Sequence, residues 1–203
     1  MDFRKKIVRY DNFLPQKMFD DIKPFLLQKK WGLSLSNPNS QSHKVFWGMI
    51  LDDGKFFAED VFYLIKKATK KNFKINQILA NAQSTLQDGS PHTDSIDPKS
   101  KTFLIYSNAE WDYQWGGETI FFDRYRIFDK NKDKTEEIIN STDIHQIYPV
   151  PNTAVYFPSN MIHYAMGPNR DFYGIRYTIA YHLITRFFSK IIIINHHTIP
   201  SET

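Results

Sequence analysis

Cysteine is absent from this chain of 203 residues, so it can form neither disulfide bonds nor thiolate metal sites. A metal would have to be held by histidine, aspartate or glutamate, which suits zinc, iron, manganese or copper rather than an iron–sulfur cluster. No apolar run reaches the roughly 18 residues of a membrane span, and the N-terminal MDFRKKIVRY lacks the apolar segment of a secretion signal. We therefore expect a soluble, cytoplasmic protein without a membrane partner.

The chain also lacks a concentrated tract of either charge. Its 26 basic and 22 acidic residues give a net charge of +4, spread over RKK, IKKATKK and DKNKDKTEE. We interpret this excess as a solvated surface. Attraction of nucleic acid or of an acidic partner is the weaker alternative.

Hydrophobic patterning divides the chain, which we expect to be a single domain over residues 1–203. NFLPQKMFDDIKPFLLQKK and GKFFAEDVFYLIKKATKKN have apolar residues at helical spacing, so a helical part is expected from about 13 to 72. Short strand-like runs separated by turn residues then predict a β core from about 74 to 185. This order predicts an α+β fold, a double-sheet β roll with the N-terminal helices packed on one sheet. The C-terminal SKIIIINHH is expected to be a strand or short helix that closes the core.

The stretch SPHTDSID contains the first candidate metal ligands, His92 and Asp94. In an extended segment, residues two apart project from the same face, so both side chains can reach one ion, and Thr93 should point away. A site with two histidines and one carboxylate needs a third ligand and leaves three coordination positions open. Among the seven histidines, His163 is the best candidate because it enters a strand after a Pro-Ser-Asn turn, whereas nothing downstream supports His145.

Arg176 lies inside the strand-like GIRYTIAYHL, where an unpaired guanidinium would be costly. It therefore needs an anion, either a carboxylate of the protein or a bound carboxylate held by two parallel hydrogen bonds. Thr178 is expected on the same face of the strand, and Tyr106 in FLIYSN could supply a further hydroxyl.

These segments, together with WDYQWGGETIFF, resemble the iron(II)/2-oxoglutarate-dependent dioxygenases, and the similarity is greatest to the prolyl 4-hydroxylase-like branch with its phage and marine bacterial members. The resemblance implies a double-stranded β-helix (jelly roll, cupin-like) fold and identifies His92, Asp94 and His163 as the iron ligands. It implies that Arg176 binds the distal carboxylate of 2-oxoglutarate, with Tyr106 and Thr178 beside it. Asn81 and Gln83 of NAQST are further pocket candidates. Gly116 and Gly117 are interpreted as residues that the backbone of a turn requires.

By this resemblance the chain uses Fe(II), 2-oxoglutarate and O2, with ascorbate as reductant, and hydroxylates an unactivated C–H bond with release of succinate and CO2. The expected substrate is a peptidyl proline, another amino-acid side chain or a small molecule. The alternatives are a nucleic-acid demethylase or base hydroxylase of the same fold, and a non-catalytic metal-binding β roll. The segments SIDPKSK and DRYRIFDKNKDK are expected to be loops at the rim of the site.

The chain departs from the family pattern at three places. NAQST stands where the strand before the iron motif often supplies a tyrosine near the cofactor. Tyr173 stands where collagen-type prolyl hydroxylases have a lysine, so Arg176 takes the role of the carboxylate-binding cation. His182 stands where the oxygen-sensing prolyl hydroxylases have a tryptophan. It could line the pocket or pack in the core, and we favour packing.

Overall fold

The computed structural model describes residues 2–28, 30–35, 44–51, 54–129 and 131–185. The predicted C-terminal strand or helix lies outside these described residues. Among these described residues, helical segments occur before the β core, apart from one short turn within it. They are η1 (Phe3–Lys6), α1 (Gln16–Asp20), α2 (Lys23–Leu26), a π-helical segment η2 (Phe56–Val61) that runs into α3 (Phe62–Thr69), and the turn η3 (Tyr113–Trp115).

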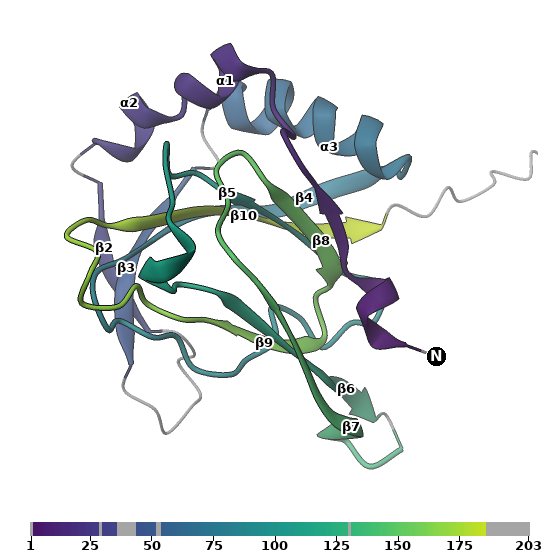
Figure 1. The fold of residues 1–203 in the computed structure, drawn as a ribbon. Helices are drawn as coiled ribbons and strands as arrows, with labels where there is room; N and C mark the ends of the chain where they lie inside the picture. Colours follow the sequence, from purple (N-terminus) through teal and green to yellow (C-terminus); the bar gives the residue numbers. More distant parts are fainter. Residues whose placement is uncertain (1, 29, 36–43, 52–53, 130, 186–203) are drawn as a thin grey trace, which may run out of the picture.

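Two sheets of antiparallel strands face each other below the helices (Figure 1). The larger sheet has the order β1-β8-β5-β10-β4-β3-β2 and the smaller one β7-β6-β9. Their strands are β1 (Val8–Tyr10), β2 (Gly32–Leu35), β3 (Val45–Ile50), β4 (Phe73–Gln83), β5 (Lys101–Tyr106), β6 (Thr119–Asp129), β7 (Lys134–Ile147), β8 (Ala154–Pro158), β9 (Met161–Ala165) and β10 (Arg176–Thr185). The predicted fold, a double-stranded β-helix with helices on one sheet, is confirmed.

The helical part of the chain is less helical than its sequence pattern predicts. Its first amphipathic stretch forms two short helices, and Pro24 lies in the first turn of α2. Proline has no N–H to donate to a preceding turn, so a single continuous helix through this position is unfavourable. The expected helical range also contributes β2 and β3, and β3 pairs with β4 (Trp47 opposite Ala82). The chain is extended there because its backbone forms hydrogen bonds with the edge of the core sheet instead of within a helix.

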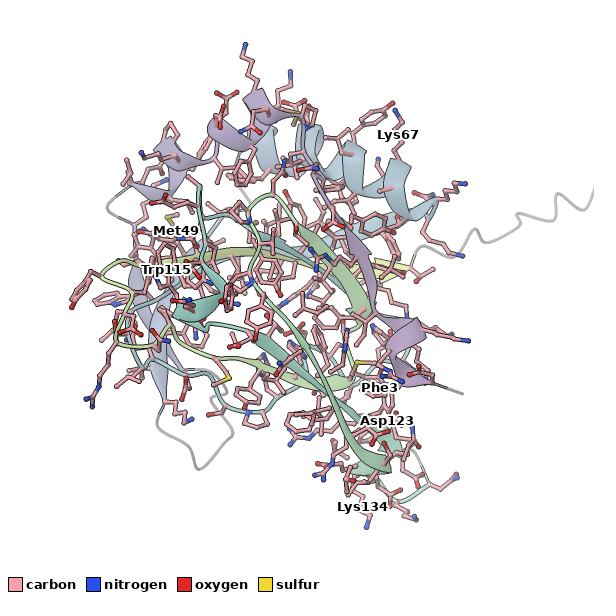
Figure 2. The ribbon with its side chains drawn as sticks, in the orientation of Figure 1. Phe3, Met49, Lys67, Trp115, Asp123 and Lys134 are labelled. Atoms are coloured by element: carbon pink, nitrogen blue, oxygen red, sulfur yellow. The ribbon has the colours of Figure 1, made fainter. Side chains whose placement is uncertain are left out.

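The prediction that the segment DRYRIFDKNKDK forms a loop at the rim of the site is wrong. β6 continues through it to Asp129 and pairs with β7, with Arg126 opposite Glu137. Figure 2 shows this hairpin, with Asp123 and Lys134 labelled, extending from the body of the molecule. Charge pairs across the two strands stabilise an exposed hairpin whose composition resembles that of a loop.

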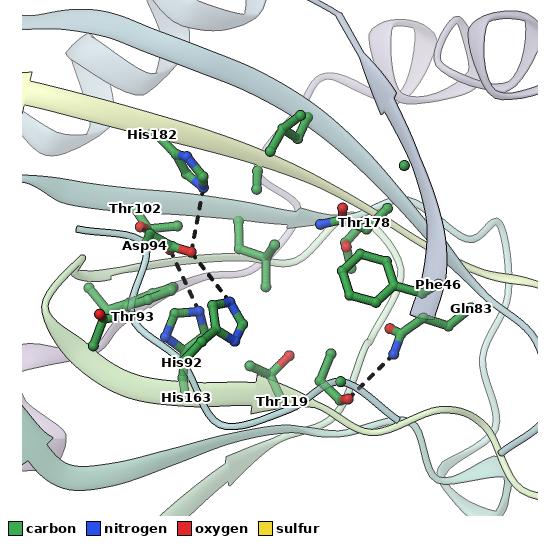
Figure 3. Close-up of a pocket in the computed structure, with 18 of the residues that line it drawn as sticks. Phe46, Gln83, His92, Thr93, Asp94, Thr102, Thr119, His163, Thr178 and His182 are labelled. Atoms are coloured by element: carbon green, nitrogen blue, oxygen red, sulfur yellow. Dashed lines mark hydrogen bonds and ion pairs between the residues drawn. The ribbon is translucent and has the colours of Figure 1, made fainter. Parts of the chain in front are cut away.

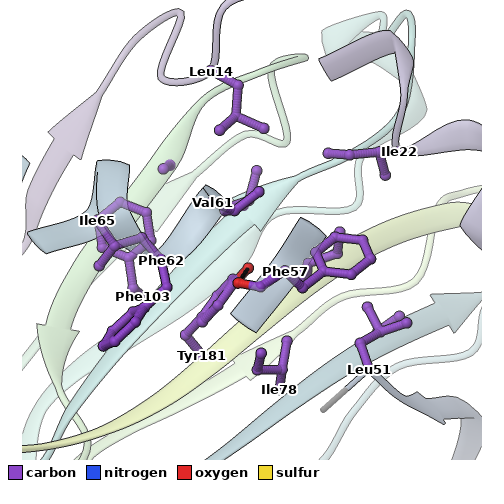
Figure 4. Packing of buried hydrophobic residues seen from close by; sticks show 14 of the residues in the cluster. Leu14, Ile22, Leu51, Phe57, Val61, Phe62, Ile65, Ile78, Phe103 and Tyr181 are labelled. Carbon is purple, nitrogen blue, oxygen red and sulfur yellow. Dashed lines mark hydrogen bonds between the residues drawn. The ribbon is translucent and has the colours of Figure 1, made fainter. Parts of the chain in front are cut away.

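Two apolar clusters occupy the two faces of the larger sheet. The cluster under the helices joins Phe57 and Ile65 to Phe103, Ile179 and Tyr181 (Figure 4). The Tyr181 hydroxyl donates to the Phe57 carbonyl at 3.1 Å, which ties the helical layer to β10. The second cluster lies between the sheets and includes the side chains Leu104, Tyr106, Phe121, Tyr125, Phe157 and Met161. Because side chains alternate along a strand, the residues of β10 that do not face the helices face the space between the sheets.

Candidate metal centre and carboxylate pocket

A cavity of about 280 Å³ opens between the two sheets. It is lined along β10 by alternate residues, Arg176, Thr178, Ala180 and His182, and along β4 by Leu79, Asn81 and Gln83. Figure 3 shows this cavity with its histidines at one end and Gln83 at the other. The period of two that defines a strand therefore puts a row of polar side chains on the inner face of the larger sheet.

The structure brings His92, Asp94 and His163 together at one end of this cavity. One ligand atom from each residue lies within 4.8 Å of the other two. The Nε2 atom of His92 is 3.5 Å from Oδ1 of Asp94, and Nε2 of His163 is 3.6 Å from Oδ2. A backbone bridge fixes the two histidines, since the N–H of each donates to the carbonyl of the other at 2.9 Å.

Hydrogen bonds at the far side of each ring determine which nitrogen faces the carboxylate. Nδ1 of His92 lies 2.8 Å from the Ser90 carbonyl, and Nδ1 of His163 lies 3.0 Å from the Met161 carbonyl. A carbonyl only accepts, so Nδ1 carries the hydrogen in both rings and Nε2 keeps its lone pair. Two Nε2 lone pairs and one carboxylate fit an Fe(II) site that leaves other coordination positions open.

The charges at this end suit a divalent cation. Burial alone would raise the pKa of Asp94, but the imidazoles of His163, His182 and His92 outweigh burial and hold this pKa well below its ordinary value. Burial lowers the pKa of His163 to about 4, so this ring is neutral at pH 7. Burial also disfavours a charged His92, but Asp94 more than offsets it and raises the pKa of that ring. The carboxylate is therefore ionised with a neutral imidazole beside it.

Arg176 lies at the other end of the cavity and is almost fully buried, with 1% of its surface exposed. Nε donates to the Gly117 carbonyl at 2.7 Å, one Nη to Gln83 Oε1 at 2.8 Å and the other Nη to Thr119 Oγ1 at 3.2 Å. Burial lowers the pKa of Arg176 to about 10, which still leaves it charged at pH 7. These acceptors are neutral, and no carboxylate among the described residues pairs with the guanidinium.

The hydrogen-bond inventory of Arg176 points to a bound anion. A guanidinium has five N–H groups, and the three bonds described above leave one on each terminal nitrogen. Two parallel N–H groups are the arrangement that a carboxylate accepts. The two alternatives that the sequence left open were a carboxylate of the protein and a bound carboxylate. No carboxylate of the described residues forms an ion pair with Arg176, and Glu118 acts on it only through its charge at longer range.

Tyr106 lies behind the cavity wall rather than on it. Its ring is fully buried 5.6 Å from the Arg176 guanidinium, and its hydroxyl donates to Thr119 Oγ1 at 2.9 Å. Thr119, which the sequence analysis missed, therefore stands between this hydroxyl and the cavity. Its place in GGETIFF, two residues after Gly117, was the signal that could have identified it. Thr178 and Asn81 do line the cavity, opposite each other on β10 and β4.

The two glycines of WGGET have backbone conformations that favour glycine, with φ of +69° for Gly116 and +77° for Gly117. A Cβ on Gly117 would also lie 2.8 Å from Trp111 Cζ2 and 3.2 Å from Arg176 Cδ. The close approach lets the Gly117 carbonyl accept from Arg176. This turn is therefore part of the carboxylate pocket as well as a connection.

The positions of three further side chains can be compared with the predictions from the sequence. His182 does not pack in a core, because it lines the cavity with Nε2 3.5 Å from Asp94 Oδ1. Thr93 also borders the cavity, since this segment forms only an isolated bridge and not a regular strand with strict alternation. Tyr173, at the position of the lysine of collagen-type prolyl hydroxylases, is 99% exposed. The cation in the pocket is therefore Arg176.

The sequence profile of the 2OG-Fe(II) oxygenase superfamily matches residues 79–183, which is more than half of the chain. The chain belongs to the 2OG-Fe(II) oxygenase superfamily. The matched range contains the His-Asp-His cluster and Arg176, so the predicted family is confirmed and an oxidoreductase is indicated. A comparison of this oxygenase with curated protein sequences finds no match.

Solved structures are similar to this oxygenase over most of their length. A prolyl-4-hydroxylase of Pseudomonas putida has a TM-score of 0.63 and 14% identity, with 90% of this chain and 94% of that chain covered. A prolyl hydroxylase of Trichoplax adhaerens, in complex with a hypoxia-inducible-factor peptide, has a TM-score of 0.64 and 14% identity, with 89% and 84% covered. The epimerase SnoN from nogalamycin biosynthesis has a TM-score of 0.63 and 10% identity, with 89% and 78% covered. At these identities, the likeness is one of fold.

Among the described residues of this oxygenase, no helix has both the length and the apolar character needed to cross a membrane.

Proposed function

We propose that this oxygenase couples the oxidative decarboxylation of 2-oxoglutarate to the hydroxylation of an unactivated C–H bond, on a peptidyl proline or another amino-acid side chain. The observation that carries the proposal is Arg176, a buried cation with only neutral acceptors in the described part of the chain. It shares one cavity with the His-Asp-His cluster. A protein that only bound a metal would not need a buried arginine at the other end of the cavity.

The residues have distinct tasks in this scheme. His92, Asp94 and His163 would hold Fe(II), and Arg176 would bind the distal carboxylate of 2-oxoglutarate. When bound, iron and 2-oxoglutarate supply the oxidation by O2, in which one oxygen atom enters succinate as CO2 leaves and the other enters the C–H bond. Gln83, Thr119 and the Gly117 carbonyl orient Arg176 in advance, so little ordering remains to be done when the acid binds.

The choice of an amino-acid side chain as substrate is supported by the comparisons. Two of the three solved structures described above are prolyl hydroxylases, and one of them was solved with a peptide. The cavity wall between the two ends includes the apolar side chains Leu79, Leu104 and Ala180 of the larger sheet. Such a wall excludes water from the site and suits an aliphatic C–H bond. Ascorbate would keep the metal in its reduced state.

Succinate formation from 2-oxoglutarate without an added substrate tests the proposal. The purified chain is supplied with Fe(II), ascorbate and O2, and succinate is measured for the wild type, His92→Ala and Asp94→Ala. We expect turnover by the wild type and its loss in both variants. His145→Ala is the matched control, because His145 lies on β7 opposite Phe121 and not in the cavity. A wild type that neither binds nor consumes 2-oxoglutarate would contradict the proposal.

Peptide libraries would then test the substrate class. A mass increase of one oxygen on a prolyl or other side chain, dependent on 2-oxoglutarate, is the expected result. The same oxidation found only on nucleobases would replace the amino-acid substrate with the nucleic-acid alternative.

A further inference from the structure

Three imidazoles, not two, face the carboxylate of Asp94. His92 and His163 belong to the candidate metal cluster, while His182 lies on β10 in the opposite sheet. Nε2 of His182 is 3.5 Å from Oδ1 of Asp94, the same separation that His92 has from this oxygen. Figure 3 shows His182 approaching Asp94 from the side opposite to the other two histidines.

The hydrogen bonds of the three rings separate His182 from the two ligands. His92 and His163 keep their hydrogen on Nδ1, bonded to a backbone carbonyl, so their Nε2 atoms have only a lone pair to offer. No hydrogen bond to Nδ1 of His182 is seen within the part of the chain that the structure describes. Its Nε2 is therefore free to carry the hydrogen. Of the three rings, His182 alone can donate to Asp94 while the other two bind a metal.

The other oxygen of Asp94 already has a donor. The Thr102 hydroxyl donates to Oδ2 at 2.5 Å, and it lies 2.9 Å from the Ser159 hydroxyl. Since Thr102 has one hydrogen and uses it on Asp94, Ser159 donates to Thr102, which makes a short chain of hydrogen bonds ending on the carboxylate. Neither Thr102 nor Ser159 donates a hydrogen bond to Oδ1 of Asp94.

We propose that His182 is a positioning residue that donates from Nε2 to Oδ1 of Asp94. Together with Thr102 it would hold the carboxylate plane toward the two ligand imidazoles. The inference rests on the proposed function, because it assumes that the cluster binds a metal. The Asp94 side chain has only 9% of its surface exposed, so water supplies little of the hydrogen bonding that an ionised carboxylate needs. Donors of this kind commonly orient metal ligands.

His182 also links the Arg176 end of the cavity to the metal cluster. Its strand contributes Arg176 and Thr178 to the same cavity, whereas His163 comes from the smaller sheet. A hydrogen bond from His182 to Asp94 therefore connects the sheet that carries the carboxylate pocket to the cluster that carries the metal.

Binding of Mn²⁺ tests this role without catalysis, with free Mn²⁺ measured by electron paramagnetic resonance. His182→Phe keeps a ring of similar size but no donor, and His182→Gln places an amide N–H near the position of Nε2. We expect a roughly 10- to 100-fold weaker Mn²⁺ affinity for His182→Phe, and recovery of most of the affinity in His182→Gln. His145→Phe is the control for loss of a half-buried histidine and should bind Mn²⁺ as the wild type does.

The outcomes separate this inference from the proposed function. If the wild type binds Mn²⁺ and turns over 2-oxoglutarate but His182→Phe binds the metal equally well, the role of His182 is wrong and the function stands. Equal loss in His182→Phe and His182→Gln, with both variants folded by circular dichroism, would show a steric role and also overturn it. A wild type without Mn²⁺ binding would overturn the inference and the proposed function together.

Discussion

At the scale of single residues, Arg176 shows how much an isolated side chain can reveal. Its position inside a strand indicated from the sequence that it must meet an anion, and the structure gives it neutral acceptors within the described residues. A buried guanidinium in such surroundings loses hydration without gaining an ion pair. In the proposed function this cost would be recovered when the distal carboxylate of 2-oxoglutarate binds to Arg176.

Arg176→Gln should therefore weaken 2-oxoglutarate binding strongly. Loss of one partner of a buried charge pair costs about 2–5 kcal/mol, and isothermal titration with 2-oxoglutarate in the presence of Mn²⁺ would measure it. The affinity for Mn²⁺ alone should stay close to that of the wild type, because the metal cluster lies at the other end of the cavity. Arg124→Gln, on the β6–β7 hairpin, is the matched control. A parallel loss of metal and 2-oxoglutarate binding would contradict this division of the cavity.

At the scale of elements, the turn that enters β6 is the most instructive segment. The paired glycines could be recognised from the sequence as a turn, but their contact with Arg176 could not, because the two segments are 59 residues apart in the chain. The β6–β7 hairpin is the opposite case. Its charged residues looked like a loop, and only pairing with each other makes them strands.

The two glycines offer a matched pair of variants. Gly116→Ala and Gly117→Ala both force alanine into a left-handed backbone conformation, which should destabilise each by about 1–3 kcal/mol, as urea unfolding would measure. Gly117→Ala has a further cost, because its Cβ would lie 2.8 Å from Trp111 Cζ2. Only a Cβ at Gly117 approaches Arg176, whereas one at Gly116 would have no atom closer than 3.6 Å. We therefore expect Gly117→Ala alone to weaken 2-oxoglutarate binding. Equal effects of the two substitutions on this affinity would show that the turn does not position Arg176.

At the scale of the whole molecule, the sequence predicts the fold class and the residues of the metal cluster more readily than the surroundings of the site. His92, Asp94 and His163 stand in short motifs whose spacing is readable in the chain. Thr102 and His182 carry no such motif, and they reach the cavity only because β5 and β10 are arranged around it, whereas Thr119 could be recognised only from its place in GGETIFF. Alternation along β10 did contain the information on His182, since it follows Arg176 by an even number of residues.

β10 also has a consequence for the energetics of the whole protein. Its inner face carries Arg176, Thr178 and His182, while Ile179 and Tyr181 on its outer face pack under the helices. A strand cannot shift one face without shifting the other. Occupation of the cavity should therefore be felt by the helical layer, and 2-oxoglutarate with Mn²⁺ should raise the melting temperature in proportion to the logarithm of ligand concentration. The helical layer would then be stabilised by a ligand that it never touches, and a melting temperature unmoved by saturating ligand would contradict binding in the cavity.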